Sequence, residues 1–450
     1  MKLLSKNAKY IFIFLFSFLC MSFFLAYFDG DVLWNYGFSY AISRGEIPYV
    51  DFNMILTPFY PFLMSILFHV FGNHILVFYI ENSFIITILF YLLFQLYGQK
   101  AWLFLLLLVF PIPAIVFPTY NLFLLFLLVL LLYLEKKESN DYLIGFIIGL
   151  SILTKQTVGF CLFLPSLYYL RKDIKKVGKR LIGCFIPILL FVIYLCCSGS
   201  FLQFLDLCLF GLLDFTEGNG RLFSLSFIIF FLLVFVLFVL KRKRFCISWW
   251  YILCFSSIAI PLFDIPHLEF FFFAICLLLI EYFFIPVHVW IKQLFLFVIS
   301  FVIIFYLFTI GGGKIYYPNH YHNFQWRNLN NQNGEFLVRD QLISYINKNK
   351  DEDEDIVILA SDAYFYKIVC NMNIDSFDLL NKGNHGYHGT EKLKKKLDKL
   401  DKGTIFIIDT NEVYSKSTNS LQFHVEVAKY AIDMGTKIKK IGGYTIYRKN

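Results

Sequence analysis

The sequence predicts a polytopic α-helical membrane protein with about 11 spans, followed by an extracytoplasmic α/β domain at the C-terminus. Three observations predict this class. Of the 450 residues, 58% are hydrophobic, compared with about 45–50% in soluble domains. Apolar stretches follow one another from residue 10 to residue 310, and the composition changes abruptly at Gly311. We therefore divide the chain into a transmembrane domain, 1–310, and a soluble domain, 311–450.

Each apolar stretch is a candidate span, although several are shorter than the roughly 20 residues that a perpendicular helix needs. The stretches cover 10–28, 75–97, 101–117, 120–134, 142–154, 157–170, 181–198, 222–240, 247–262, 267–284 and 289–309. The first follows Lys2, Lys6 and Lys9, is longer than the apolar part of a signal peptide, and lacks a cleavage motif. We expect it to be a retained anchor with a cytoplasmic N-terminus.

Basic loops predict the topology, because cytoplasmic loops carry an excess of Lys and Arg. Such residues cluster at 136–137, 171–180 and 241–244, so we expect all three loops in the cytoplasm. Residues 29–74 then form the first external loop. An odd number of crossings must follow before residue 136, which leaves 58–72 as a short helix in the outer interface.

The same counting requires residues 142–170 to cross twice, because they join two cytoplasmic loops. Two short helices with a tight turn at 154–157 satisfy this requirement and bring Lys155 to the outer face. A single tilted helix would put Arg171 on the wrong side.

Charge and cysteine usage argue against a nucleic-acid-binding protein and against a zinc protein. The formal net charge is +8, but Lys and Arg lie in short loops between apolar stretches and form no nucleic-acid patch. None of the 10 cysteines belongs to a CxxC pair, and no His/Cys spacing predicts zinc.

The C-terminal domain is predicted from strands that alternate with helices. Buried strands are expected at 356–360 and 405–408, and a final strand pair, split by Gly442-Gly443, at 436–448. Helices are expected within 328–350, at 390–400 and at 421–434. The domain has no GxGxxG motif and no P-loop, so a nucleotide site is not indicated.

Asp29 and Asp31 follow the first span directly, and charge this close to hydrocarbon is usually functional. Their carboxylates are candidates for a general base toward an acceptor hydroxyl or amine. Two alternatives stay open: Asp29 caps a helix over 32–44, or the pair binds a divalent cation.

Further candidates lie at the outer ends of helices. Arg44 and Asp51 flank a Gly-x-x-Pro-Tyr turn, where a structural ion pair is favoured over substrate contacts. Lys155, with Gln156 beside it, can hold a lipid phosphate as a point charge, or it can be a snorkelling lysine. His267 and Arg221 are the other residues to test, since most polar groups at helix ends are simply solvated.

Three segments together resemble bacterial membrane glycosyltransferases of the GT-C superfamily, near the protein mannosyltransferase and aminoarabinose transferase branches. The first is the Asp-rich segment after the first span. The second is A-I-x-x-G-x-x-P-Y-x-D-F…P-F-Y-P-F-L…L-F…F-G over 41–72, and the third is G-x-x-x-G-L-S-I-L-T-K-Q-T over 145–157. The resemblance covers about residues 1–310; the tail resembles no family that we can name.

The resemblance implies an inverting enzyme that takes a sugar from a polyprenyl-phosphate carrier at the outer leaflet. The family's catalytic aspartate maps onto Asp29 or Asp31, and Lys155 or Arg221 would neutralise the phosphate that leaves. In-plane helices and an external soluble domain are also typical of the family. The Asp-Gly-Asp sequence departs from the Asp-Glu pair of mannosyltransferases, which leaves open the identity of the base and the use of a metal.

The expected partners are therefore a polyprenyl-phosphate-linked sugar, membrane lipid, and a glycan, lipid or protein acceptor of the cell envelope. The composition, rich in Lys, Asn, Ile and Phe, is typical of AT-rich bacterial genomes, so we expect a bacterial plasma-membrane protein. A polysaccharide polymerase, a lipid-linked glycan flippase and a non-catalytic assembly subunit are the alternatives. A transporter is disfavoured because no internal repeat is found and the polar residues gather at one face.

Overall fold

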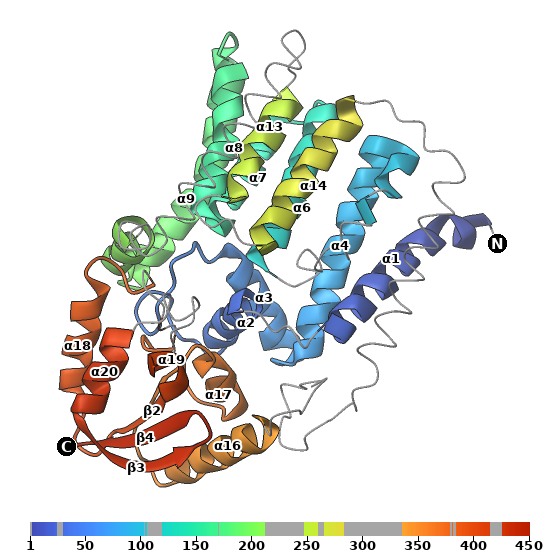
Figure 1. Ribbon diagram of the computed structural model, residues 1–450. Coiled ribbons are helices and arrows are strands. Elements are labelled where there is room, and N and C mark those ends of the chain that lie inside the picture. The colour runs from blue at the N-terminus through green and yellow to red at the C-terminus, as the bar shows by residue number, and fades with distance from the viewer. Residues whose placement is uncertain are drawn as a thin grey trace.

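Apolar helices and a smaller domain with a mixed sheet make up the computed structural model, with the sheet at the lower left in Figure 1. The structure describes residues 2–24, 30–102, 104–105, 119–169, 171–211, 247–259, 265–282, 335–378, 380, 384–414 and 425–450.

The helices of the N-terminal part follow the predicted stretches closely where they are described. Their bounds are α1 (Lys2–Phe24), α2 (Gly30–Ser43), α3 (Phe59–Phe71), α4 (Ile75–Tyr97), η1 (Gly98–Trp102), α6 (Tyr120–Lys136), α7 (Asp141–Thr154), α8 (Gln156–Tyr169), α9 (Ile174–Cys197), α10 (Phe201–Leu205), the π-helical η3 (Asp206–Phe210), α13 (Ile247–Phe255), η4 (Ser256–Ala259) and α14 (Ile265–Tyr282). The stretches expected at 222–240 and 289–309, and most of 101–117, lie outside the described residues.

Length and apolarity qualify two helical segments of the described part as membrane spans, Ile75–Trp102 and Ile174–Cys197. Other apolar helices there, such as α3 and α7, have 10–17 residues. The count of about 11 spans therefore stays a prediction.

Side-chain contacts fix the directions of the first helices. The Tyr10 and Phe94 rings lie 6.1 Å apart, and Asn82 Nδ2 donates to Met21 Sδ at 3.2 Å, so α1 runs antiparallel to α4. The Lys136 ammonium donates to the Leu96 carbonyl at 2.6 Å. Near the starts of the two helices, Tyr60 contacts both Glu81 of α4 and Phe123 of α6. Thus α4 and α6 meet at both ends and run parallel.

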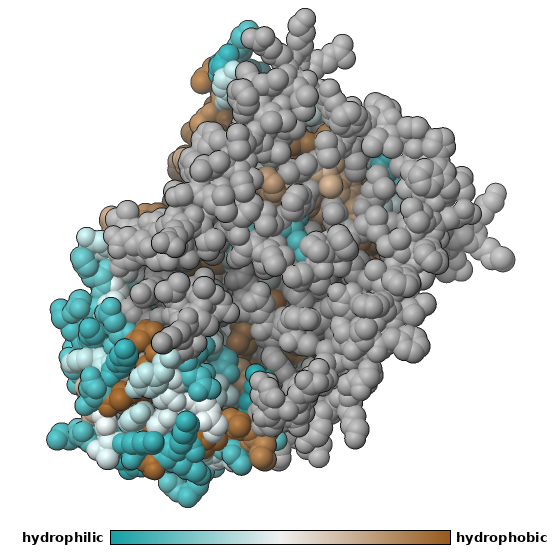
Figure 2. Space-filling view, in the orientation of Figure 1, coloured by the Kyte–Doolittle hydropathy of each residue, from teal (hydrophilic) through white to brown (hydrophobic). Residues whose placement is uncertain are grey.

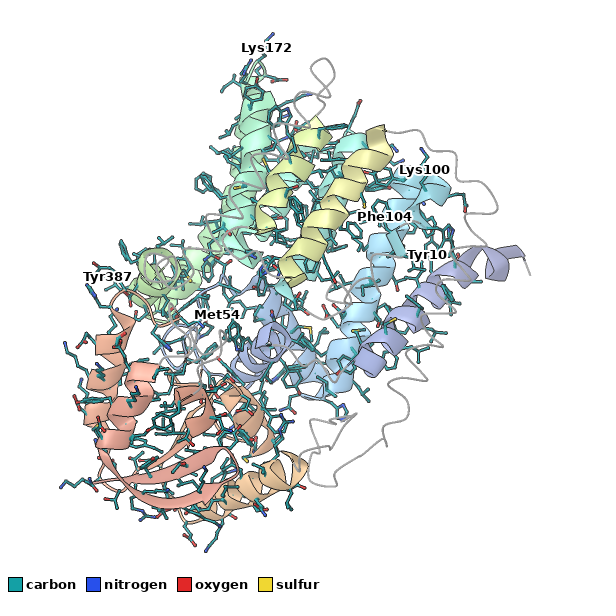
Figure 3. All side chains as sticks on the ribbon, viewed as in Figure 1. Tyr10, Met54, Lys100, Phe104, Lys172 and Tyr387 are labelled. Carbon is teal, nitrogen blue, oxygen red and sulfur yellow. The ribbon has the colours of Figure 1, made fainter. Side chains whose placement is uncertain are left out.

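Arg180 of α9 connects its own helix to four others at this same end. Its guanidinium binds Glu135 of α6 bidentately, Asp141 of α7 at 2.8 Å and Tyr251 of α13 at 3.0 Å, and it also reaches Ser166 of α8 at 3.3 Å. The guanidinium is almost fully buried, and its pairing compensates the desolvation of the charge. Lys136 lies at this end too, and in Figure 3 Lys100 and Lys172 lie on the side away from the C-terminal domain, so this end of the helices carries several basic residues.

Apolar side chains cover the outside of several helices. Phe185, Leu189, Leu190 and Ile193 of α9 are each at least half exposed. On α4, the exposed side chains at 76, 80, 84, 88 and 91 recur at helical spacing. Figure 2 shows hydrophobic colour along the edge formed by α9 and hydrophilic colour over much of the C-terminal domain. Such exposed apolar stripes are typical of surfaces that face lipid or a partner.

The C-terminal domain contains a four-stranded mixed sheet in the order β1-β2-β4-β3. Its elements are α16 (Glu335–Asp351), β1 (Ile356–Leu359), α17 (Ala363–Val369), α18 (Gly389–Lys399), β2 (Ile405–Asp409), α19 (Thr410–Tyr414), α20 (Val425–Asp433), β3 (Gly435–Ile441) and β4 (Tyr444–Lys449). β1 and β2 are parallel, with Ile356 opposite Ile405, and β4 is antiparallel to both β2 and β3. All four strands coincide with the predicted stretches.

Successive side chains of each strand point to opposite faces of the sheet. Val357 and Phe406 belong to a core with Leu393 of α18 and Val427 of α20. Ile358 and its neighbours on the opposite face belong to the larger core of the molecule, which also includes residues of α16, α17 and α2. The C-terminal domain is therefore packed onto the helices of the N-terminal part.

The contact of α17 with α2 is unusually close. A Cβ at Gly37 would lie 2.2 Å from Cδ1 of Tyr364, so only glycine leaves room for this ring. The Tyr364 ring is fully buried and packs edge-on against Phe38 at 5.9 Å.

Candidate functional site

The α7–α8 hairpin places Lys155 at its apex. Lys155 ends α7 with an extended backbone, φ −150° and ψ 104°, and α8 begins at the next residue. A Cβ at Gly159 would lie 2.3 Å from the Ile152 nitrogen, so the chain turns back directly against α7. The predicted division of 142–170 into two helices is thus observed.

The Lys155 ammonium is held in a buried polar cluster. It donates to Asn121 Oδ1 of α6 at 3.1 Å and lies 3.3 Å from His267 Nε2 of α14. It also lies 5.3 Å from the Tyr120 ring centroid. Lys155 is 6% exposed, so it does not snorkel to water. Because burying an ammonium is expensive, such a cation is usually retained for a function.

The Lys155 cluster joins the helix that carries Asp31. Asn35 of α2 accepts a hydrogen bond from the Tyr120 backbone N–H at 3.3 Å, next to the asparagine that binds Lys155. Asp31 lies in the first turn of α2, about 6 Å along the helix axis from Asn35. The side chain of Asp31 and the whole of Asp29 and Arg221 lie outside what the structure describes.

Gln156 anchors the first loop to the hairpin. Its Nε2 donates to the Ile55 carbonyl at 2.9 Å, and Thr57 Oγ1 donates to the Ile152 carbonyl at 2.8 Å. The other amide atom, Gln156 Oε1, is buried and has no hydrogen-bond partner among the described residues. Gln156 therefore positions the loop and keeps one free acceptor at the apex.

Arg44 and Asp51 do not form the structural ion pair that the sequence favoured. Arg44 instead binds Asn371 and Asn373 of the C-terminal domain, and its Nε lies 3.7 Å from Glu46. Asp51 accepts from the Ile47 N–H at 2.6 Å and shapes its own loop. In this structure both residues have structural contacts.

A group of charged residues, of which the sequence singled out only Arg44, joins the loop to the C-terminal domain. We call Arg44, Glu46, Lys367, Asp375 and Asp378 the docking cluster. The Lys367 ammonium binds Asp375 at 2.9 Å and lies 3.8 Å from Asp378, and the Ile374 N–H donates to Glu46 at 3.2 Å. The sequence signal was Lys367 itself, a single cation inside the apolar run of α17.

Burial perturbs the titration of the docking cluster. It raises the pKa of Glu46 to about 7, although the Ile374 N–H and Arg44 oppose the shift. Burial and Asp375 both raise the pKa of Asp378. Burial acts to lower the pKa of Lys367, but Asp375 and Asp378 outweigh it, so that pKa is raised.

Within the described ranges, no group of three His, Cys, Asp or Glu side chains has the arrangement of a metal site. The Asp29 and Asp31 carboxylates are not covered by that finding. Comparison of the chain with protein-family profiles, characterised proteins and solved structures finds no match. The case for a function therefore depends on residues and geometry.

Proposed function

We propose that this protein is a membrane glycosyltransferase that transfers a sugar from a polyprenyl-phosphate carrier to a cell-envelope acceptor. The observation that carries the proposal is the buried Lys155 ammonium, held by Asn121 and His267 at a hairpin apex beside α2. It lies near the N-terminus of α6, which Asn35 links to the helix that Asp31 opens.

The chemistry requires a cation and a base at one place. The acceptor oxygen or nitrogen attacks the anomeric carbon, the bond from that carbon to the phosphate oxygen breaks, and the acceptor proton moves to Asp29 or Asp31. Lys155 stabilises the phosphate monoester dianion that leaves. Arg221 is a second candidate for this role. No nucleotide is consumed, because the carrier linkage is already activated.

The arrangement of the helices supports a site at the outer face. Basic side chains gather at the end marked by Arg180, Lys100 and Lys172, which we assign to the cytoplasm. Lys155 lies at the other end of α7 and α8, on the side of the C-terminal domain. Exposed apolar stripes on α4 and α9 fit contact with lipid. We accordingly propose an extracytoplasmic C-terminal domain in a bacterial plasma membrane.

The test uses the variants Asp29→Asn, Asp31→Asn and Lys155→Gln in the source bacterium, in a strain from which the chromosomal copy is deleted. We expect at least one aspartate variant and Lys155→Gln to abolish the surface-glycan modification that the wild-type copy restores. Loss of one oxyanion-stabilising group typically slows catalysis about 100- to 1,000-fold. The matched controls are the variants Lys172→Gln and Asp353→Asn, which change exposed residues and should restore the modification fully.

Membrane levels of each variant are measured by immunoblot. If both aspartate variants reach wild-type levels and leave the glycan unchanged, the catalytic assignment is wrong. If a lipid-linked glycan instead accumulates on the inner leaflet of the deletion strain, the protein is a flippase.

A further inference from the structure

Glu81 is a carboxyl group buried inside an apolar helix. It lies in the second turn of α4, and 8% of its surface is exposed. The Tyr60 hydroxyl donates to Oε2 at 3.4 Å, while Oε1 has no hydrogen-bond partner among the described residues. A buried acid with one weak contact lowers stability, so it requires an explanation other than packing.

The helix geometry places Glu81 at the depth of the Lys155 cluster. α4 and α6 run parallel, and Lys136 contacts Leu96 at their common end. Glu81 lies fifteen residues before Leu96 in α4. Asn121, which binds Lys155, lies fifteen residues before Lys136 in α6. Because both helices rise by the same 1.5 Å per residue, Glu81 and Asn121 are at about the same level.

Aromatic rings surround this position. The Tyr60 ring centroid lies 5.5 Å from that of Phe123 and 6.4 Å from that of Phe78. Phe78 in turn packs edge-on against Tyr36 of α2 at 5.5 Å. Glu81 therefore contacts Tyr60, one member of a series of aromatic side chains that connects α2, α3, α4 and α6. Binding sites for small polar molecules typically combine such apolar walls with a few fixed polar groups.

We propose that Glu81 binds the sugar of the lipid-linked donor, accepting hydrogen bonds from its hydroxyl groups, while Lys155 binds the donor phosphate. This rests on the proposed function. A carboxyl group has two oxygens and can therefore form hydrogen bonds with two sugar hydroxyl groups at once. Lys155 and Glu81 thereby recognise two chemically different parts of one donor.

The test measures binding to the full-length protein in lipid nanodiscs. The ligands are a polyprenyl monophosphate without sugar and the same lipid bearing glucose, galactose or mannose. We expect wild-type protein to bind at least one sugar-bearing lipid about 10- to 100-fold more tightly than the bare lipid. Glu81→Gln should lose most of that preference and bind the bare lipid unchanged, and Lys155→Gln should weaken binding of every lipid.

Three variants control for structure. Glu391→Gln changes an exposed carboxyl of α18 and should match wild type. Tyr60→Phe removes the one side-chain hydrogen bond of Glu81 seen among the described residues, and it should keep most of the sugar preference. Glu81→Asp keeps a carboxyl group and should restore part of the preference that Glu81→Gln loses. Thermal midpoints identify any variant that is misfolded.

The outcomes separate the two proposals. If wild type prefers a sugar-bearing lipid and Glu81→Gln keeps that preference, or if wild type binds all four lipids equally, the role of Glu81 is overturned while that of Lys155 stands. If Tyr60→Phe loses the preference as fully as Glu81→Gln, Glu81 is structural. If no lipid binds, or if Lys155→Gln binds all of them as well as wild type, the proposed function itself fails.

Discussion

The contact between Gly37 and Tyr364 tests whether the C-terminal domain is anchored on α2. In Gly37→Ala, the added methyl group would lie 2.2 Å from one ring carbon of Tyr364 and 2.7 Å from the next. The ring is fully buried, so it has no open space to move into. Forcing an extra methyl group into a packed core costs about 1–3 kcal/mol. Alanine in a helix interior gains up to about 1 kcal/mol over glycine.

Because the approach to the buried ring is so short, the steric cost is about 2–3 kcal/mol. Subtracting about 1 kcal/mol for helix propensity leaves a weakening of docking by about 1–2 kcal/mol. Hydrogen–deuterium exchange of the α17 amides measures this opening directly. Their exchange should accelerate roughly 5- to 30-fold. Amides of α18, which pack in the second core of the domain, serve as an internal reference.

Two further variants make the reasoning refutable. Gly178→Ala in α9 meets no atom within 4 Å and should leave α17 exchange unchanged. Combining Gly37→Ala with Tyr364→Leu should destabilise docking less than the sum of the single changes, because the methyl group then fills part of the space left by the ring. Unchanged α17 exchange in Gly37→Ala, or strict additivity in the double variant, would refute the proposed contact.

Three other predictions follow from the charged groups. Arg180→Met should lower stability by about 3–5 kcal/mol, because it leaves buried carboxylates unpaired, and a loss of thermal stability in detergent would show it. Glu46 has a docked-state pKa of about 7 against an ordinary 4.5, so docking should be strongest below pH 4.5 and weaken as the pH rises through 7; Glu46→Gln should flatten the α17 exchange profile over that window. Asp206→Asn should weaken the half-exposed ion pair with Lys392 by no more than about 1 kcal/mol, which corresponds to an at most severalfold faster exchange in α18.

Local pattern predicted much of the secondary structure. The break at Lys155 was predicted from two basic loops that must lie on one side, and the final strand pair was predicted to be split by Gly442-Gly443. These features depend on short-range preferences and on solvent charge rules, so they are encoded in neighbouring residues.

The contact partners of the polar and charged side chains were harder to predict. Arg44 was paired with Asp51 on the basis of proximity in sequence, whereas it binds Glu46 and two asparagines more than 300 residues away. Glu81 was overlooked because its burial and its weak contact with Tyr60 depend on how α3 packs against α4. The Lys155 site was only partly predicted: His267 was a candidate, but Asn121 and Asn35 were not.

By itself, the sequence determined roughly where the described helices and strands lie, which end of the bundle is basic, and that a cation lies at a hairpin apex. Only the tertiary structure decided which side chains meet that cation, that Glu81 lies at its depth, and that the C-terminal domain packs on α2. The physical reason is that secondary structure follows from the periodicity of neighbouring residues, whereas the energies of buried charges depend on groups brought together from distant parts of the chain.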